Sequence, residues 1–110
     1  MNFRMQEGEQ IIKQGKANRS KLLVAQGGEL TLTNKRLIFV SHGMNIGEGT
    51  ISIDIDEIMT YGKAFTFSIW FPLPIPNAFK VVLRNGSMYK FTVSGRGKWL
   101  NEVGGLINSL

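Results

Sequence analysis

The sequence predicts a small domain that is mainly β, with one α-helix at its C-terminal end. Short runs of Ile, Val, Leu, Phe and Thr are separated by many of the 13 glycines, as in β-rich domains. The hydrophobic period lengthens from two residues to about 3.6 only within residues 96–110. The 110 residues suffice for one hydrophobic core and contain no linker, so we expect a single domain over residues 1–110.

The first hairpin is expected within residues 28–41, GELTLTNKRLIFVS. Leucines alternate with threonines along residues 30–33, and residues 37–40 return as a second strand. Asn34 and Lys35 offer a two-residue turn between them, because asparagine tolerates a positive φ. We therefore predict a tight hairpin centred on Asn34.

Residues 51–58, ISIDIDEI, are expected to form one further strand. Isoleucines at 51, 53 and 55 alternate with Ser52, Asp54 and Asp56. Because successive side chains of a strand point to opposite faces, the isoleucines should face the core and the polar residues should face water. The sheet should therefore have one solvent-facing side.

A second hairpin is expected within residues 79–93, and its loop length decides which side chains face the core. A two-residue loop at Asn85 and Gly86 would split the apolar side chains between the two faces. A three-residue loop over residues 84–86, with Gly86 left-handed, gathers them on one face. We favour this register, which places Phe79, Val81, Leu83, Tyr89, Phe91 and Val93 inward and Lys80, Arg84, Met88 and Lys90 outward.

The stretch FSIWFPLPIP, residues 67–76, is uncharged and has prolines at 72, 74 and 76. Alternation within residues 64–70 predicts that Phe65, Phe67 and Ile69 face the core and Trp70 faces away. Phe71 is expected to continue the inner set. Because proline cannot donate to a ladder of hydrogen bonds, residues 71–76 should run extended along a sheet edge.

Two interpretations of this stretch remain open. In the structural one, Phe71, Leu73 and Ile75 cover an open end of the sheet and leave Trp70 singly exposed. In the functional one, Trp70, Leu73 and Ile75 form an exposed apolar patch flanked by Lys63 and Lys80. Such a patch would suit a membrane interface, a homodimer or a protein partner.

The C-terminal residues predict one amphipathic helix. Its apolar stripe has helical spacing and comprises Trp99, Val103, Leu106, Ile107 and Leu110. Ser94 is the expected N-cap, and Gly104 and Gly105 each lower helix propensity by about 1 kcal/mol relative to alanine. The helix should therefore depend on tertiary packing, with Trp99 sealing one end of the sheet.

Basic residues dominate two parts of the chain, whose net charge is +5. Residues 58–101 contain six cations and no acid, and residues 11–28 contain a second acid-free group. The two groups are Lys63, Lys80, Arg84, Lys90, Arg96 and Lys98, and Lys13, Lys16, Arg19 and Lys21. An excess of this kind attracts anionic lipid headgroups or nucleic acid.

The residue inventory disfavours an enzyme. There is no cysteine, and His42, the single histidine, has no recognisable partner. Asp54 and Asp56 suit a solvated edge better than a metal or acid-base site, so we expect no metal and no cofactor. The N-terminus lacks a secretory signal, and the uncharged run between Lys63 and Lys80 is too short for a membrane span. A cytoplasmic setting with peripheral membrane attachment is the resulting expectation.

Four segments together resemble the GRAM domain and its bacterial pleckstrin-homology-like relatives. They are GEQII at residues 8–12, GELTLTNKRLIFVS at 28–41, ISIDIDEI at 51–58 and GRGKWLNEV at 95–103, with LTLTNKRLIF the most specific. The resemblance covers nearly the whole chain. It implies a partly open barrel of about seven antiparallel strands capped by the helix. It also implies a non-catalytic module that binds membranes, phosphoinositides or proteins.

These observations favour a binding module that attaches to anionic membrane lipid. In pleckstrin-homology-like domains, a basic connection between the first strands often binds the headgroup, which suggests the cations of residues 11–28. The candidate residues are Lys13, Lys16, Arg19, Lys21, Lys63, Trp70, Leu73, Ile75 and Lys80. The alternative is a protein-interaction or homodimerisation module that uses the same apolar stretch. Nucleic-acid binding is disfavoured, because the aromatic residues of the second hairpin are needed inside.

Overall fold

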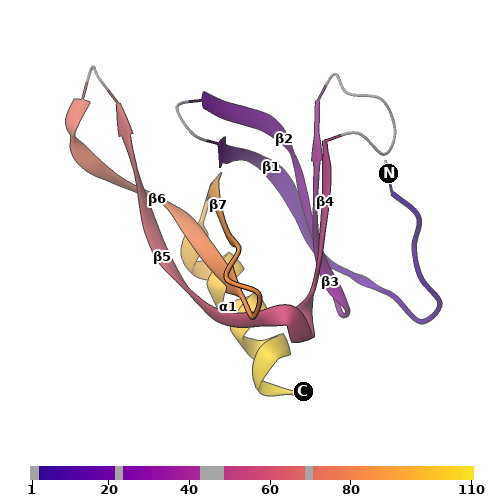
Figure 1. Cartoon of the computed structure of the whole chain (residues 1–110). Helices are drawn as coiled ribbons and strands as arrows, with labels where there is room; N and C mark the ends of the chain where they lie inside the picture. Colours follow the sequence, from indigo (N-terminus) through magenta and orange to yellow (C-terminus); the bar gives the residue numbers. More distant parts are fainter. Residues whose placement is uncertain (1–2, 22–23, 43–48, 69–70) are drawn as a thin grey trace.

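A computed structural model describes residues 3–21, 24–42, 49–68 and 71–110, which form seven strands and one α-helix (Figure 1). The strands are β1 (Ile11–Lys21), β2 (Val24–Thr33), β3 (Arg36–Ser41), β4 (Thr50–Asp54), β5 (Ile58–Ser68), β6 (Phe71–Leu83) and β7 (Met88–Val93). A 3-10 turn, η1 (Ile55–Glu57), joins β4 to β5, and α1 (Arg96–Asn108) follows β7. All strand pairs are antiparallel, in the order β4-β3-β2-β1-β7-β6-β5.

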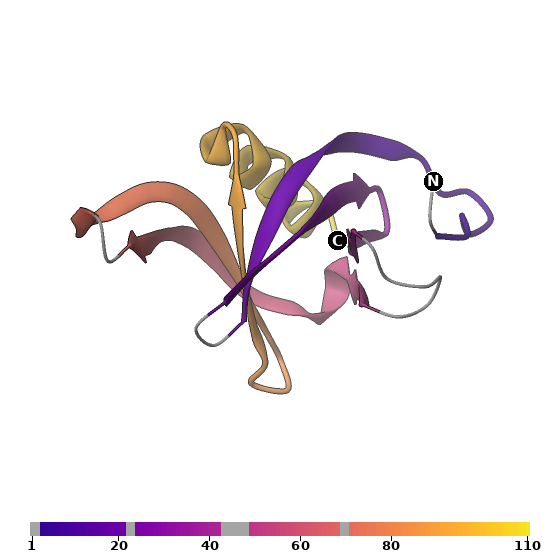
Figure 2. The ribbon, with the colours of Figure 1, turned by 90° about the horizontal axis from the view of Figure 1, so that it is seen from above.

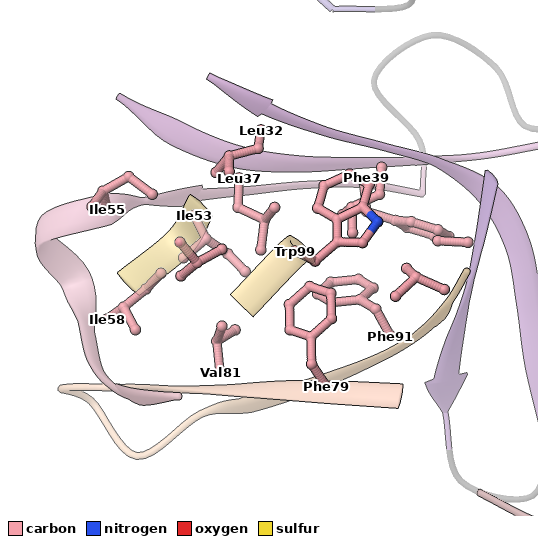
Figure 3. Close-up of a cluster of buried hydrophobic side chains, with 14 of the residues drawn as sticks. Leu32, Leu37, Phe39, Ile53, Ile55, Ile58, Phe79, Val81, Phe91 and Trp99 are labelled. Carbon is pink, nitrogen blue, oxygen red and sulfur yellow. The ribbon is translucent and has the colours of Figure 1, made fainter. Parts of the chain in front are cut away.

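The sheet curls into a half-barrel, and α1 lies across its opening against β5, β6 and η1 (Figures 1 and 2). Trp99 of α1 is 2% exposed, and its ring stacks on Phe79 with 6.2 Å between centroids. Phe79 contacts Phe91, which contacts Phe39, so aromatic rings connect the helix to β3 (Figure 3). The predicted fold class and the predicted sealing role of Trp99 are confirmed.

Both predicted hairpins form in the expected registers. Leu32 pairs with Leu37 around Asn34 and Lys35. In the second hairpin the Leu83 amide donates to the Ser87 carbonyl at 2.8 Å, which leaves residues 84–86 as a three-residue loop. Gly86 has φ +90°, as that loop requires. The expected inward residues are buried, except Tyr89, which is half-buried against the core.

Two predictions about the helix ends are wrong. The N-cap is Gly95 rather than Ser94, because the chain reverses from β7 into α1 through a left-handed residue, with φ +69°. Leu110 lies beyond the end of α1 and is 74% exposed, so it does not extend the apolar stripe. Trp99 and Val103 are buried, while Leu106 and Ile107 are half-buried.

The prediction of one continuous strand over residues 51–58 is also wrong. β4 ends at Asp54, and η1 turns the chain toward β5. Ile53, Ile55 and Ile58 are nevertheless all buried, because one 3-10 turn returns a side chain to the same face after three residues. The Glu57 carboxylate accepts from the Asp54 amide at 3.2 Å and so closes this turn.

A buried ion pair ties the N-terminal segment to the first hairpin. The guanidinium of Arg36 donates to both carboxylate oxygens of Glu9, at 2.7 and 3.0 Å, and the Thr33 hydroxyl donates to the same carboxylate at 2.6 Å. Asn34 adds a further contact between the same two segments, since its side-chain oxygen accepts a hydrogen bond from the backbone amide of Gln10. The hydrogen bond from Arg36 holds the pKa of Glu9 at about 2, against the opposing effect of burial. The two motifs GEQII and LTLTNKRLIF therefore bind each other.

We predict that Glu9→Gln removes an acid-dependent part of the stability. The folded-state pKa of Glu9 lies below its unfolded value near 4.5, so the stabilisation is complete above pH 4.5 and is lost as the pH falls toward 2. From that difference in pKa, the contribution near neutral pH is about 3 kcal/mol. Urea unfolding of wild type and variant from pH 3 to 7 should show a difference in stability that narrows as the pH falls. Glu7→Gln, two residues away and exposed, is the control that should leave the pH profile unchanged.

We also predict that the two helix glycines respond differently to alanine. A Cβ at Gly105 would meet open space, whereas one at Gly104 would lie 2.6 Å from the Tyr61 hydroxyl oxygen. Gly105→Ala should therefore raise the free energy of unfolding by about 0.5–1 kcal/mol, and Gly104→Ala should give less or destabilise. Urea unfolding measures both changes. In a Tyr61→Ala background the two substitutions should become equivalent; equal effects in the wild-type background would contradict the assignment.

Candidate functional site

β5 and β6 continue past the rest of the sheet as a two-stranded ribbon, here called the arm, comprising residues 64–68 and 71–77 (Figures 1 and 2). β7 pairs with β6 from Ala78 onward, so residues 71–77 lie beside β5 alone. The pairing is irregular, with register shifts on both sides of Thr66. An extended stretch with a strand on one side only is where a sheet tolerates prolines, and the predicted edge position is confirmed.

The arm exposes large apolar side chains. Phe65, Phe67 and Leu73 are 45%, 70% and 62% exposed, while Ile75 is half-buried. The predicted burial of Phe65 and Phe67 in the core is therefore wrong, as is the interpretation in which Leu73 covers an open end of the sheet. Ile69 and Trp70 lie outside the described residues, as do the side chain of Phe71 and its predicted place in the inner set.

Alternation fails here because the arm extends beyond the helix. Tyr61 pairs with the core residue Val81, and Lys63 pairs with Phe79, so the side chains of Tyr61 and Lys63 lie on the core side of the sheet. Tyr61 still meets α1 at Gly104. Phe65, two positions beyond Lys63, meets the start of α1, where the Arg96 guanidinium lies 5.2 Å from its ring centre. A side chain can face the core side of a sheet without a core to cover it.

Two cations hold the base of the arm from neighbouring elements. Arg96, at the start of α1, donates to the carbonyl of Ala64 at 2.7 Å and, more weakly, to that of Ala78 at 3.4 Å. Lys90 of β7 donates through Nζ to the Phe65 carbonyl at 2.9 Å. The carbonyls of Ala64 and Phe65 lie at the register shift between Ala64 and Thr66. The sequence does not point to this role for Arg96 or Lys90, because their hydrogen bonds reach from α1 and β7 to β5 and β6, which are distant in the sequence.

Cations lie next to the base of the arm, and β5, β6 and β7 contain no acid. Lys63 and Lys80 are both exposed. They lie on opposite faces of the sheet, because Lys63 is registered with Phe79 and Lys80 with Gly62 and Lys90. Lys63 and Lys80 therefore flank the base of the arm from its two sides.

The cations of β1 do not form one cluster. Lys13 lies over the Trp99 ring, with Nζ 5.3 Å from its centre, and Arg19 lies 5.2 Å from the Tyr89 ring centre. Lys16 is exposed on the other face, in a hollow of about 340 Å³ that it shares with Asn18, His42, Thr92 and Ser94. The side chain of Lys21 lies outside the described residues. Two of the four residues are thus engaged with aromatic rings of the fold.

The described residues offer no metal-binding group of three or more His, Asp or Glu side chains. No helix in the described ranges combines the length and apolar character needed to cross a bilayer.

Comparison with known proteins identifies the fold. The C-terminal domain of an unknown protein from Leishmania infantum superposes with a TM-score of 0.74 at 19% identity, covering 92% of this chain and 86% of that one. The Vps36 N-terminal PH domain superposes with a TM-score of 0.73 at 14% identity, covering 96% and 84%. No family profile and no curated protein sequence matches the chain. The fold is thus that of a pleckstrin-homology-like domain.

We predict that Arg96→Ala loosens the arm. The substitution leaves the Ala64 and Ala78 carbonyls without this donor and removes the cation from the Phe65 ring. Loss of about 1.4 kcal/mol makes the locally open state about tenfold more populated, so amide hydrogen exchange in residues 63–68 should accelerate roughly tenfold. Arg84→Ala is a matched control, because Arg84 also donates to a backbone carbonyl, that of Asp56, at the other end of β6. Unchanged amide hydrogen exchange in residues 63–68 of the Arg96→Ala variant would contradict the role of Arg96 in holding the arm.

Proposed function

We propose that this chain is a non-catalytic binding module that associates peripherally with anionic membrane lipid on the cytoplasmic side. The supporting observation is the arm, where large apolar side chains are exposed on a part of the sheet that has cations and no acid. Apolar exposure without charge would suit many partners. Its combination with Lys63 and Lys80 on the two faces favours a negatively charged, partly apolar surface.

The arm has the geometry of an interfacial anchor. Phe67 and Leu73 would enter the region between headgroups and acyl chains, while the lysines at the base of the arm reach the phosphates. Each lysine near an anionic surface contributes about 1 kcal/mol, and the apolar side chains add the burial that a few charges do not supply.

Four of the eight acidic residues lie where they do not oppose this orientation. Asp54, Asp56 and Glu57 belong to the end of β4 and to η1, and Glu9 is buried in its ion pair with Arg36. β5 runs away from η1 for 11 residues, which is about 35 Å of extended chain. The far end of the arm is thus distant from these three acids, which lie next to the start of β5.

The remaining candidate residues are proposed as secondary contacts. Lys16 is exposed and is proposed as a weaker headgroup contact, because its register partner on β2 is the exposed Glu29. Lys13 and Arg19 are committed to aromatic rings and would contribute charge more than direct contact. Trp70 and Lys21 remain predictions from the sequence alone.

The membrane proposal predicts a specific outcome in liposome flotation. The wild-type chain should bind vesicles containing phosphatidylserine more strongly than pure phosphatidylcholine vesicles, and raising the salt concentration should weaken this binding. The double variant Phe67→Ser, Leu73→Ser should reduce partitioning at least about tenfold, because two apolar anchors are lost. Met88→Ser, Leu110→Ser is the matched control, since it removes two exposed apolar side chains outside the arm.

Equal binding to neutral and anionic vesicles, or an equal loss in the control, would contradict the membrane proposal. Light scattering of the lipid-free protein addresses the alternative of self-association through the same stretch. A concentration-dependent dimer that disappears in the Phe67→Ser, Leu73→Ser variant, together with no vesicle binding, would assign the apolar arm to a homodimer instead.

A further inference from the structure

β5 is a long edge strand. Within the part of the chain that the structure describes, it pairs with β6 and with no other strand, and it spans 11 residues. The opposite edge, β4, has five residues and ends in Asp54. An edge strand presents unpaired backbone donors and acceptors, which form a template for a further strand. In β5 the carbonyls of Ala64 and Phe65 are exceptions, because Arg96 and Lys90 donate to them. β5 contains no proline and a single charge, Lys63, so its sequence does little else to block such addition.

The side chains of β5 specify what a neighbouring strand must carry. Tyr61, Lys63 and Phe65 alternate on one face, so a cation lies between two aromatic rings that are each more than one third exposed. On the other face, Gly62 leaves open space, with no atom within 4 Å of the position of a Cβ. Residues directly opposite in a sheet interact as pairs, so these positions set the preferred partner side chains.

A second copy of this chain does not fit the edge. An antiparallel pairing of β5 with itself about its central residue would place Lys63 beside Lys63 of the other copy. Like charges directly opposite are destabilising, and an inward-facing edge lysine is a common device against self-pairing. Lys63 therefore disfavours the homotypic pairing centred on it while leaving the edge open to a strand of opposite charge.

We propose that the β5 edge accepts an extended segment of another protein, in which an acidic residue faces Lys63 and apolar residues two positions to either side face Tyr61 and Phe65. The partner sequence has the form apolar-x-acid-x-apolar. Backbone hydrogen bonds to β5 would supply affinity, and the Lys63 pair would supply the choice of partner. This proposal does not depend on membrane binding, since it uses the side of β5 opposite to β6 rather than the tip of the arm.

A synthetic peptide provides the probe. Acetylated and amidated GSTITETITSG places one glutamate between two isoleucines at the required spacing, and GSTITKTITSG differs only by lysine in place of glutamate. Titration without lipid, followed by fluorescence anisotropy of the labelled peptide, should show binding of the glutamate peptide that is about tenfold or more tighter than that of the lysine peptide, because like-charge juxtaposition is costly. Two N-methylated peptides, one modified at the glutamate and one at the two threonines beside it, cover both directions in which strand amides point, and one of the two should lose binding because it lacks the strand hydrogen bonds.

The charge swap Lys63→Glu should reverse the preference between the two peptides. Lys98→Glu, an exposed lysine on α1, is the control with the same change in net charge and should preserve the original preference. Absence of binding, insensitivity to N-methylation, or an unreversed preference in Lys63→Glu would each overturn the proposal. Because the Phe67→Ser, Leu73→Ser variant keeps Lys63 and the β5 backbone, it should still bind the peptide, which separates this result from failure of the membrane proposal.

Discussion

The stacking of Trp99 on Phe79 is the contact on which the arrangement of this domain depends. A curved sheet of seven strands has a concave face that a short sequence cannot fill with strand side chains alone. The Trp99 indole fills this space and extends the series of contacting aromatic rings that continues from Phe79 through Phe91 to Phe39. Because the indole is carried on a helix of 13 residues, its position also fixes where that helix begins and ends over the sheet.

The start of the helix then determines the base of the arm. Arg96 lies one turn before Trp99 and reaches the carbonyls of Ala64 and Ala78 at the point where the β5–β6 ladder is irregular. Beyond this point no element of the described part of the chain covers the ribbon, and Phe65 and Phe67 are exposed. The same packing that completes the core therefore leaves the apolar arm outside it, next to Lys63 and Lys80. The two proposed activities share Lys63 but otherwise use different parts of this region: the exposed apolar residues Phe67 and Leu73 for lipid and the β5 edge for a strand.

The motif most specific to the resemblance has a structural role in this chain. Thr33, Asn34 and Arg36 of LTLTNKRLIF contact the N-terminal segment that contains Glu9. A buried ion pair contributes less net stability than its short distances suggest, because both charges lose solvation, but removal of one partner leaves the other unpaired. Recognition of this motif therefore identifies the fold and says little about a ligand. Functional differences between domains of this shape must come from surfaces such as the arm.

The amino-acid sequence by itself determined the strand hairpins, the C-terminal helix and the buried aromatic residues. These features follow from local rules: the two-residue period, the left-handed Gly86 and the helical spacing of Trp99 and Val103. Only the tertiary structure decided that Phe65 and Phe67 are exposed, that η1 interrupts residues 51–58, and that β5 is an edge. Period-two alternation states which face of a strand a side chain occupies, but whether that face is covered depends on how far a distant helix extends across it.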